Sequence, residues 1–296
     1  MKTLKEIYQA NEELNYIDSS LYSRYRVKAG LRNDNGTGVK VGLTKICDVI
    51  GYKFVHEKKY NIDGQLIYRG YPINYLVDKQ PKDRIFGFEE VAFLLIFGTL
   101  PTEEQLQEFK DYLLNFKMGP VDLQYETPNI LNALQIEVLK LYAKDPSADT
   151  DDLEERMMKG LNILASIPLF TFSYARNKVF KSYPYPDKSL AENILCMARG
   201  NDQYTFEEAR ILDTLLMVHA DHGGGNNSTF ANVVISSTGT DIYSCISAAI
   251  GSLKGPKHGG ANCKVTNMFK AIFHEVGFTT DKLTLKKIAN RLLDKD

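Results

Sequence analysis

Two glycine-rich segments hold three of the five histidines in this 296-residue chain. The first segment reads His219-Ala-Asp-His222-Gly-Gly-Gly-Asn226, and the second reads His258-Gly-Gly directly after a Gly-Pro-Lys stretch. Imidazole and amide groups can bind an anionic ligand or transfer a proton, and glycines let a ligand approach the backbone closely. These two segments are therefore the first candidates for a functional site.

The residues of the first segment leave three interpretations open. His219 and His222 stand three residues apart at the end of an expected helix, and with Asp221 they could bind a metal such as zinc. The glycine run followed by Asn226 and Ser228 could cradle a phosphate, although the lysine and the spacing of a P-loop are missing. The structural interpretation is a helix C-terminus with capping glycines and a histidine that satisfies the last carbonyls.

The second segment places His258 between two expected helices. A histidine at a helix N-terminus feels the positive end of the helix dipole, which disfavours the protonated imidazole. A neutral imidazole there can donate a hydrogen bond to a developing enolate oxygen. The alternative is a histidine exposed in a loop. His56 and His274 stand in charged or amphipathic stretches and are interpreted as surface residues.

Most of the chain is expected to be helical. Gly200 is expected to end one helix, and Asp241 precedes another that runs from Ile242 to Lys254. The polar stretch from Lys144 to Asp152, which contains Pro146, predicts a surface loop. In a capping box, the side chains of the N-cap residue and of the third helical residue each accept a hydrogen bond from the other residue's backbone amide. This pattern predicts helix starts at Thr102, Ser189 and Thr205.

One stretch favours β-structure. Lys53 to Tyr60 and Gln65 to Tyr68 flank Asp63-Gly64, a dipeptide typical of hairpin turns. The predicted fold class is therefore mainly α, with a short β-hairpin near residues 53–68.

Composition limits the partners. Lys and Arg number 36 and Asp and Glu 37, so the net charge of −1 lacks the basic excess of a nucleic-acid binder. The longest apolar run, Val91 to Phe97, is too short to span a membrane, and the N-terminal residues hold no secretory signal. The cysteines form no CxxC pair, which is typical of free thiols in a reduced compartment. We therefore expect a cytoplasmic protein without nucleic-acid or membrane partners.

Three runs of sequence together resemble the citrate synthase family. They are HADHGGGNNSTF at residues 219–230, SSTGTDIYS at 236–244 and GSLKGPKHGGAN at 251–262. Upstream segments such as Tyr68-Arg-Gly-Tyr-Pro72 agree, and the similarity extends from about residue 30 to the end of the chain. Two His-Gly motifs with the family's separation and the linking helix make this resemblance specific.

The resemblance implies a mainly helical large domain, a smaller domain and a homodimer. It also implies an acyltransferase that condenses acetyl-CoA with oxaloacetate to citrate and CoA, a reaction of the tricarboxylic acid cycle. No cofactor and no metal is implied. A 2-methylcitrate synthase, which uses propionyl-CoA, is the alternative within the family.

The resemblance also assigns roles to individual positions. His258 matches the catalytic histidine that stabilises the enol of acetyl-CoA. His222 matches a residue that binds oxaloacetate, and Asn226 stands beside it. Ser228 is expected to orient the catalytic imidazole, and His219 is a supporting residue at the substrate site.

The same resemblance predicts a large helical domain over residues 1–262 and the first part of the small domain over 263–296. The family's Gly-x-Gly-His loop, its aspartate base and its carboxylate-binding arginines are not found in residues 278–296. We therefore expect the chain to be truncated before that loop and to be inactive alone. A short paralogue that pairs with a full-length synthase is an alternative, which a reading frame continuing past codon 296 would exclude. A metal hydrolase built on His219, Asp221 and His222 is another.

Overall fold

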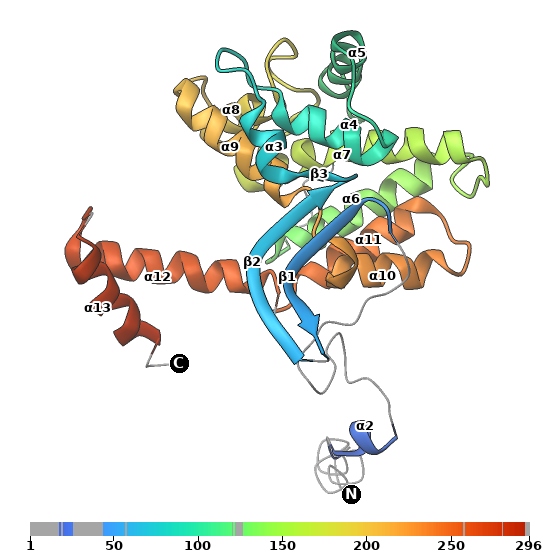
Figure 1. Cartoon of the computed structure of the whole chain (residues 1–296). Coiled ribbons are helices and arrows are strands. Elements are labelled where there is room, and N and C mark those ends of the chain that lie inside the picture. Colours follow the sequence, from blue (N-terminus) through green and yellow to red (C-terminus); the bar gives the residue numbers. More distant parts are fainter. Residues whose placement is uncertain are drawn as a thin grey trace, which may run out of the picture.

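The computed structural model describes residues 18, 20–25, 44–56, 58–119, 121, 127–256, 258–279 and 281–293. Helices dominate this part of the chain, and its strands form one small antiparallel sheet (Figure 1), so the predicted mainly α fold class is confirmed. The helices of the body are α3 (Ile73–Asp78), α4 (Gly87–Phe97), α5 (Glu103–Leu114), α6 (Ile130–Lys144), α7 (Leu153–Arg176), α8 (Leu190–Arg199), α9 (Phe206–His219), α10 (Asn227–Ser236) and α11 (Ile242–Leu253). Outside the body lie α2 (Ser20–Arg24), α12 (Gly260–Val276) and α13 (Lys282–Leu293).

The predicted β-hairpin is present and is longer than expected. Strand β1 (Cys47–Val55) pairs antiparallel with β2 (Lys58–Tyr68), and the two-residue β3 (Tyr71–Pro72) pairs with the end of β2. The chain reverses after His56, whose φ of 47° lies in the left-handed region. In Figure 1 the tip of the β1–β2 hairpin extends away from the helices, while the base of the hairpin lies against them.

The predicted turn at Asp63-Gly64 is wrong, because this dipeptide lies inside β2. Ile50 pairs with Gln65 and Tyr52 pairs with Asn61, so the register shifts at Gly51. Extra residues on one strand of an antiparallel pair form a bulge, and a dipeptide that tolerates unusual backbone angles fits a bulge as well as a turn.

The predicted helix starts are confirmed. The side chains of all three capping residues accept a hydrogen bond from the N3 amide, and the N3 side chain accepts one from the backbone amide of the capping residue. Helix α8 ends at Gly200 with a φ of 77°, the left-handed conformation that glycine adopts without strain. Asp241 caps α11 by accepting from the amide of Ser244. Local side-chain chemistry thus sets where these helices begin and end.

The two largest of the four hydrophobic clusters among the described residues join most of the body. The larger one packs α4, α5, α7 and α8 around residues such as Leu114 and Leu169, and Phe93 meets Phe109 edge to face at a centroid distance of 5.6 Å. The second cluster joins the base of the sheet to α4 and α9 and contains the fully buried Tyr68 and Met217. This second cluster lies directly beneath the end of α9 that leads into the first histidine segment.

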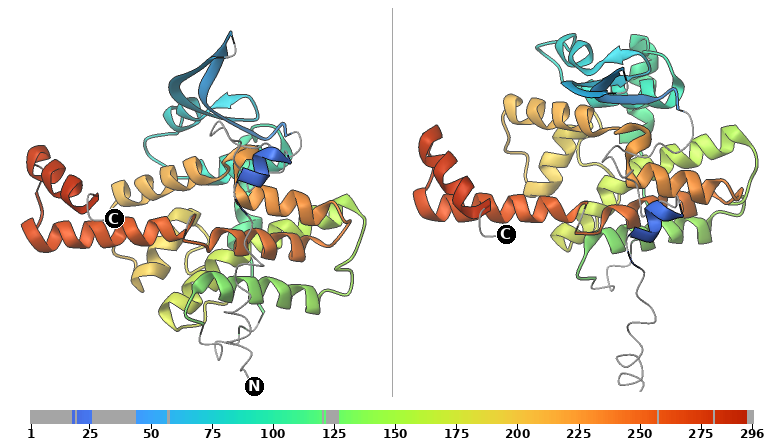
Figure 2. Two further views of the ribbon diagram at one scale, coloured as in Figure 1. Left: turned by 90° about the horizontal axis from the view of Figure 1, so that it is seen from below. Right: turned by 60° about the horizontal axis from the view of Figure 1, so that its bottom comes forward.

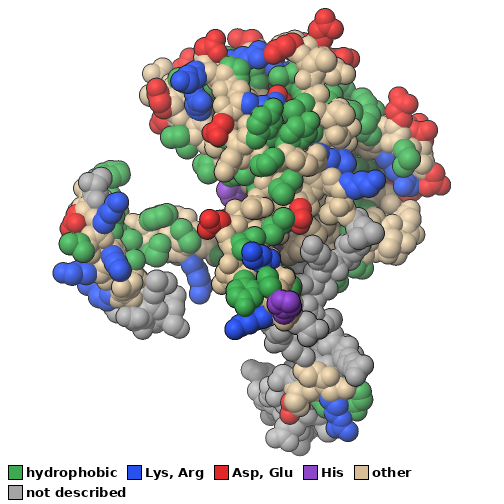
Figure 3. All heavy atoms as spheres, in the orientation of Figure 1, with side chains coloured by type: hydrophobic (Ala, Val, Ile, Leu, Met, Phe, Trp, Pro, Cys, Tyr) green, Lys and Arg blue, Asp and Glu red, His purple; other side chains and the backbone are tan. Residues whose placement is uncertain are grey.

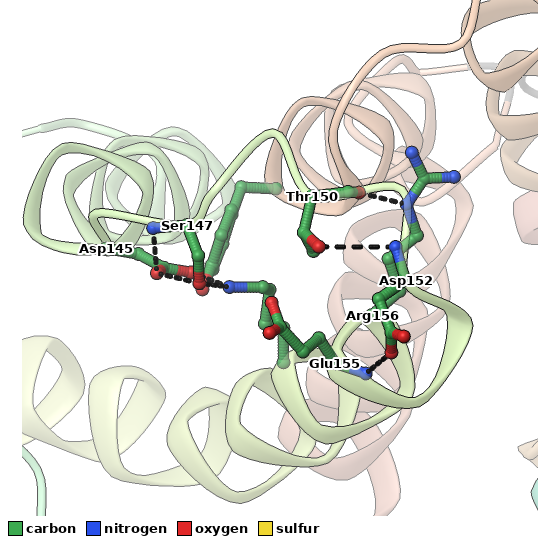
Figure 4. A network of polar contacts seen from close by, with 8 residues as sticks. Asp145, Ser147, Thr150, Asp152, Glu155 and Arg156 are labelled. Carbon is green, nitrogen blue, oxygen red and sulfur yellow. Dashed lines mark hydrogen bonds and ion pairs between the residues drawn. The ribbon is translucent and has the colours of Figure 1, made fainter.

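The loop between α6 and α7 is confirmed as a polar connection, and hydrogen bonds shape it (Figure 4). The side chain of Asp152 caps α7 by accepting from the amide of Glu155 at 2.9 Å. The Arg156 guanidinium donates to the carbonyl of Thr150 at 2.7 Å. Asp145 accepts from Lys159, which is nearly fully buried, and this contact ties the start of the loop to α7.

Helices α12 and α13 pack against each other and extend from the body in both views of Figure 2. Apolar and basic side chains cover the visible face of this arm in Figure 3. The expected domain boundary at residues 262–263 falls within the first turn of α12. The division of the chain into two domains stays a prediction.

No helix in the described part of the chain combines the length and the apolar character needed to cross a bilayer. The cysteines are free thiols. Three of them are buried and Cys263 is exposed.

Candidate active site

The first histidine segment forms a short connection between two helices. Helix α9 ends at His219, the 3₁₀ turn η2 covers Gly223–Gly225, and α10 begins at Asn227. His222 is exposed and occupies the N-cap position of η2. The side chain at the centre of this connection is therefore accessible to a ligand.

The base of the sheet supports this connection. The buried hydroxyl of Tyr68 lies 3.1 Å from the carbonyl oxygens of both Met217 and Asp221. The same hydroxyl accepts a hydrogen bond from the Asp221 amide at 3.2 Å. Burial raises the pKa of Tyr68 to about 12, so the hydroxyl keeps its proton at neutral pH.

Gly223 fits closely against the first strand. Its φ is 73°, and a Cβ atom at this position would lie 3.2 Å from the carbonyl oxygen of Cys47. Its amide donates to Asp221 Oδ1 at 2.7 Å. Burial, followed by the charges of Asp221 and Asp48, raises the pKa of the Cys47 thiol to about 12. Cys47 is a buried residue of the second hydrophobic cluster.

Asn226 and Ser228 contact each other at the start of α10. Asn226 Oδ1 accepts from the Ser228 amide at 2.7 Å and from the Ser228 hydroxyl at 2.5 Å. The carbonyl side of the Asn226 amide is thus used to cap the helix, and its NH2 group remains a potential donor to a ligand. The Ser228 hydroxyl donates to Asn226 in this arrangement.

His219 lies in the last turn of α9. Its Nδ1 is 2.8 Å from the carbonyl of Leu215, and because a carbonyl only accepts, Nδ1 carries the hydrogen. This is the contact that the structural interpretation of the segment predicted for a histidine at a helix end.

His258 lies in the tight turn between α11 and α12. Its amide donates to the carbonyl of Gly255 at 3.0 Å, and its own carbonyl accepts from the Ala261 amide at 3.0 Å. The residue is half-buried and directly precedes Gly259, the N-cap of α12. The predicted position of His258 at a helix N-terminus is therefore confirmed.

Helices α10 and α11 place the two histidine segments at the same end of this helix pair. The two helices pack closely side by side and are joined by the short stretch 237–241 (Figure 1), so they run antiparallel. The start of α10, at Asn226, therefore lies at the same end of the pair as Leu253, the last residue of α11. The His222 connection precedes α10 and the His258 turn follows α11, so both lie at this end of the helix pair.

The metal interpretation gains no support from the geometry of its three residues. His219 Nδ1 and Asp221 Oδ1 are both engaged with backbone groups. Within the described ranges, no group of three His, Cys, Asp or Glu side chains is arranged to hold an ion.

The sequence interpretation did not find the role of Tyr68, which contacts residues 149 and 153 positions away. No local pattern marks such a long-range contact. The Asn226–Ser228 contact could have been found, because an Asn two residues before a Ser at a helix start is a typical local hydrogen-bonding pattern.

Comparisons with known proteins give the family to which this fold belongs. The family model described as citrate synthase, C-terminal domain, matches residues 32–296. The chain is 39% identical to the citrate synthase of Haloferax volcanii over 223 residues, which cover 71% of this chain and 56% of that protein. It is 37% identical to 2-methylcitrate synthase 1 of Corynebacterium glutamicum over 209 residues, which cover 67% and 53%.

Solved structures agree. The crystal structure of citrate synthase from Thermotoga maritima MSB8 matches with a TM-score of 0.65 and 28% identity, covering 91% of this chain and 65% of that one. The chain belongs to the citrate synthase family. It spans about half the length of the curated relatives it matches.

Proposed function

We propose that the longest protein encoded by the gene of this chain condenses acetyl-CoA with oxaloacetate and releases citrate and CoA. The observation that carries this proposal is the antiparallel α10–α11 pair, which brings the His222 and His258 segments to one end. In the reaction, a base takes a proton from the methyl group of acetyl-CoA, the resulting enol carbon attacks the ketone carbon of oxaloacetate, and the ketone oxygen takes up a proton to become the hydroxyl of citrate. Water then cleaves the thioester and CoA leaves.

His258 is the proposed catalytic donor. Loss of the methyl proton places negative charge on the thioester oxygen, and an N–H donor held close to that oxygen lowers the barrier. A turn fixed by backbone hydrogen bonds on both sides of His258 is suited to hold its ring in one place. Such pre-organisation is what makes a donor effective in the transition state.

His222 and Asn226 are the proposed contacts to oxaloacetate. His222 is exposed, and the NH2 group of Asn226 remains free to donate because its Oδ1 is engaged with Ser228. Donors of this kind suit the carboxylate and ketone oxygens of oxaloacetate. His219 supports the segment at the end of α9.

The proposed orienting role of Ser228 requires one rearrangement. A neutral imidazole that donates from one nitrogen accepts on the other. The Ser228 hydroxyl would therefore have to donate to the accepting ring nitrogen of His258, whereas here it donates to Asn226. We propose that this hydroxyl changes partner when the substrates bind.

Propionyl-CoA is the second candidate substrate, because the chain is 37% identical to a 2-methylcitrate synthase. Measuring the kcat/KM of CoA release for acetyl-CoA and propionyl-CoA separates the two. A ratio above ten in favour of acetyl-CoA supports citrate synthesis, and the opposite ratio supports the alternative.

We also propose that the protein is a cytoplasmic homodimer that needs neither metal nor cofactor and acts in the tricarboxylic acid cycle. Free cysteines are typical of a reduced compartment, which supports the cytoplasmic assignment. Exposed apolar side chains on two helices that both pack against α11 support association, including Leu139 on α6 and Val234 on α10. Sedimentation tests the proposed homodimer. Activity measured after chelation tests the proposed independence from metal.

The proposed activity is tested with the longest protein that the gene encodes. CoA release should require both acyl-CoA and oxaloacetate, and His222→Ala should raise the KM for oxaloacetate at least tenfold. Release of CoA without oxaloacetate would identify a thioesterase and contradict the proposal.

A further inference from the structure

We propose that Tyr68 and Asp221 are positioning residues that hold His222 in its substrate-binding place. This inference rests on the proposed function of His222. It assigns a catalytic purpose to the β-hairpin, whose base supplies Tyr68 from a position 153 residues before Asp221.

The hydrogen bonds act on both sides of His222. On the preceding side, the amide and the carbonyl of Asp221 both contact the Tyr68 hydroxyl, at 3.2 and 3.1 Å. On the following side, the Gly223 amide donates to Asp221 Oδ1 at 2.7 Å. The backbone of His222 is thus held between two residues that are themselves fixed, which sets the position from which its exposed side chain extends.

The sheet provides a rigid anchor for Tyr68. Tyr68 pairs with Cys47 on β1 and with Tyr71 on β3, and its ring is fully buried. A Cβ at Gly223 would approach the carbonyl of Cys47, so the strand also limits the histidine connection from a second direction. A buried ring in a three-stranded sheet is a more constant reference point than the surface connection that it supports.

The residue after Tyr68 reinforces this anchor. Arg69 has a φ of 49°, in the left-handed region that non-glycine residues rarely adopt. Its guanidinium donates to the carbonyl of Leu95 at 2.7 and 3.2 Å, and its amide donates to Ile46 at 2.8 Å. Strained conformations persist where surrounding contacts determine them, and they cluster at functional sites.

The buried hydroxyl is needed for position more than for packing. Tyr68→Phe keeps the ring and removes one hydroxyl, which leaves the Asp221 amide and two carbonyls without this partner. The segment that carries His222, between α9 and α10, must then move toward water for these backbone groups to regain hydrogen-bond partners. Movement of His222 would weaken its contacts with oxaloacetate and leave acyl-CoA binding nearly unchanged.

The chain contains a matched control. Tyr183 is also a buried tyrosine whose hydroxyl donates to a backbone carbonyl, that of Ala165 at 2.8 Å, but it lies in the larger core cluster. Tyr183→Phe therefore reports the cost of losing a buried tyrosine hydroxyl without any effect on the His222 connection.

In the experiment, the KM values for oxaloacetate and acyl-CoA are measured for wild type, Tyr68→Phe and Tyr183→Phe. Tyr68→Phe should raise the oxaloacetate KM about tenfold, equivalent to about 1.4 kcal/mol, and change the acyl-CoA KM less than twofold. Tyr183→Phe should change neither. Equal oxaloacetate KM values for the two variants would overturn the proposal.

Hydrogen exchange gives a readout that does not depend on activity. Amides of residues 219–226 should exchange faster in Tyr68→Phe than in wild type or Tyr183→Phe. If exchange is faster only in Tyr68→Phe but the wild-type enzyme releases no CoA, the positioning contact stands and the proposed reaction fails. If exchange is unchanged in a Tyr68→Phe enzyme that still releases CoA, the proposed reaction stands and the positioning contact fails.

Asp221 supplies a second, independent test, which holds even where Tyr68→Phe fails to fold. Asp221→Asn keeps Oδ1 as an acceptor for the Gly223 amide, whereas Asp221→Ala removes it. The Asn variant should keep an oxaloacetate KM within about threefold of wild type, and the Ala variant should raise it about tenfold. Equal effects of the two substitutions would exclude positioning through this hydrogen bond.

Discussion

The amide of Gly259 donates a hydrogen bond of 2.8 Å to the carbonyl of Leu253, and this contact closes the turn that carries His258. A Cβ atom at residue 259 would lie 2.2 Å from the same carbonyl oxygen. Gly259→Ala should therefore force the α11–α12 turn open and displace His258. We expect CoA release to fall at least a hundredfold, with a loss of about 2 kcal/mol in the free energy of unfolding.

Gly255→Ala is the matched control, because a Cβ at residue 255 meets no atom within 4 Å. This variant should keep the activity and the stability of wild type. If the two alanine variants behave alike, the close approach between Gly259 and Leu253 does not hold the turn.

A buried carboxyl pair should make the stability depend on pH. Glu89 is fully buried, and burial followed by the charge of Asp213 raises its pKa to about 8. Its Oε1 accepts from the Leu190 amide, and Oε2 has no hydrogen-bond partner among the described residues. Burial also raises the pKa of Asp213 to about 6.

A carboxyl group with a raised folded-state pKa contributes stability in full below its ordinary pKa, and this contribution is lost as the pH rises through the folded value. For Glu89 the window lies between about pH 4.5 and 8. Glu89→Gln should flatten this dependence and stabilise the protein at pH 8.5 by on the order of 3 kcal/mol. Urea unfolding at pH 5 and pH 8.5 measures this, with the exposed Glu104→Gln as the control.

The ion pair between Lys159 and Asp145 should stabilise the loop between α6 and α7. Burial acts to raise the pKa of Asp145, but hydrogen bonds from Lys159, Tyr243 and Ser147 outweigh it and lower the pKa to about 2. A lowered carboxyl pKa contributes stability above its ordinary value of 3.8, which is lost as the pH falls toward 2.

Lys159→Met removes the cation and leaves the carboxylate of Asp145 half-buried without it. We expect a loss of about 3 kcal/mol in the free energy of unfolding at pH 7. Arg84→Met breaks the exposed pair with Glu103 and should cost less than about 1 kcal/mol. Equal losses in thermal or urea unfolding would show that burial of the Lys159 pair has no energetic consequence.

The sequence predicted those features that depend on neighbouring residues. The capping boxes at Thr102, Ser189 and Thr205 are bonds between residues three positions apart, so local chemistry alone predicts them. The position of His258 at the start of α12 followed from the glycines around it. Each of these elements has a cause within one helical turn.

Features set by distant contacts were not predicted. Asp63-Gly64 has the composition of a turn, but pairing along the whole length of β1 and β2 places it in a bulge. The Tyr68–Asp221 contact joins a strand to a connection far along the chain. Strand register and such contacts depend on which surfaces pack together, and a single sequence does not encode this in any short pattern.

The last prediction concerns His258 itself. His258→Ala removes the proposed N–H donor and leaves the turn intact, because the backbone bonds of residue 258 with Gly255 and Ala261 do not involve its side chain. Removal of one donor that stabilises an oxyanion typically lowers kcat by about 10²–10³. We therefore expect kcat for CoA release to fall by at least this factor, while the oxaloacetate KM changes less than threefold.

Two controls separate chemistry from structure. His274→Ala alters an exposed histidine in the last turn of α12, the helix that follows His258, and should leave kcat unchanged. His258→Gln retains an N–H donor and should recover part of the activity lost in His258→Ala, because a side-chain amide can donate to the same oxygen. Full activity of His258→Ala would reduce the residue to a structural role, and the donor to the enolate would then have to come from another group at the α10–α11 end.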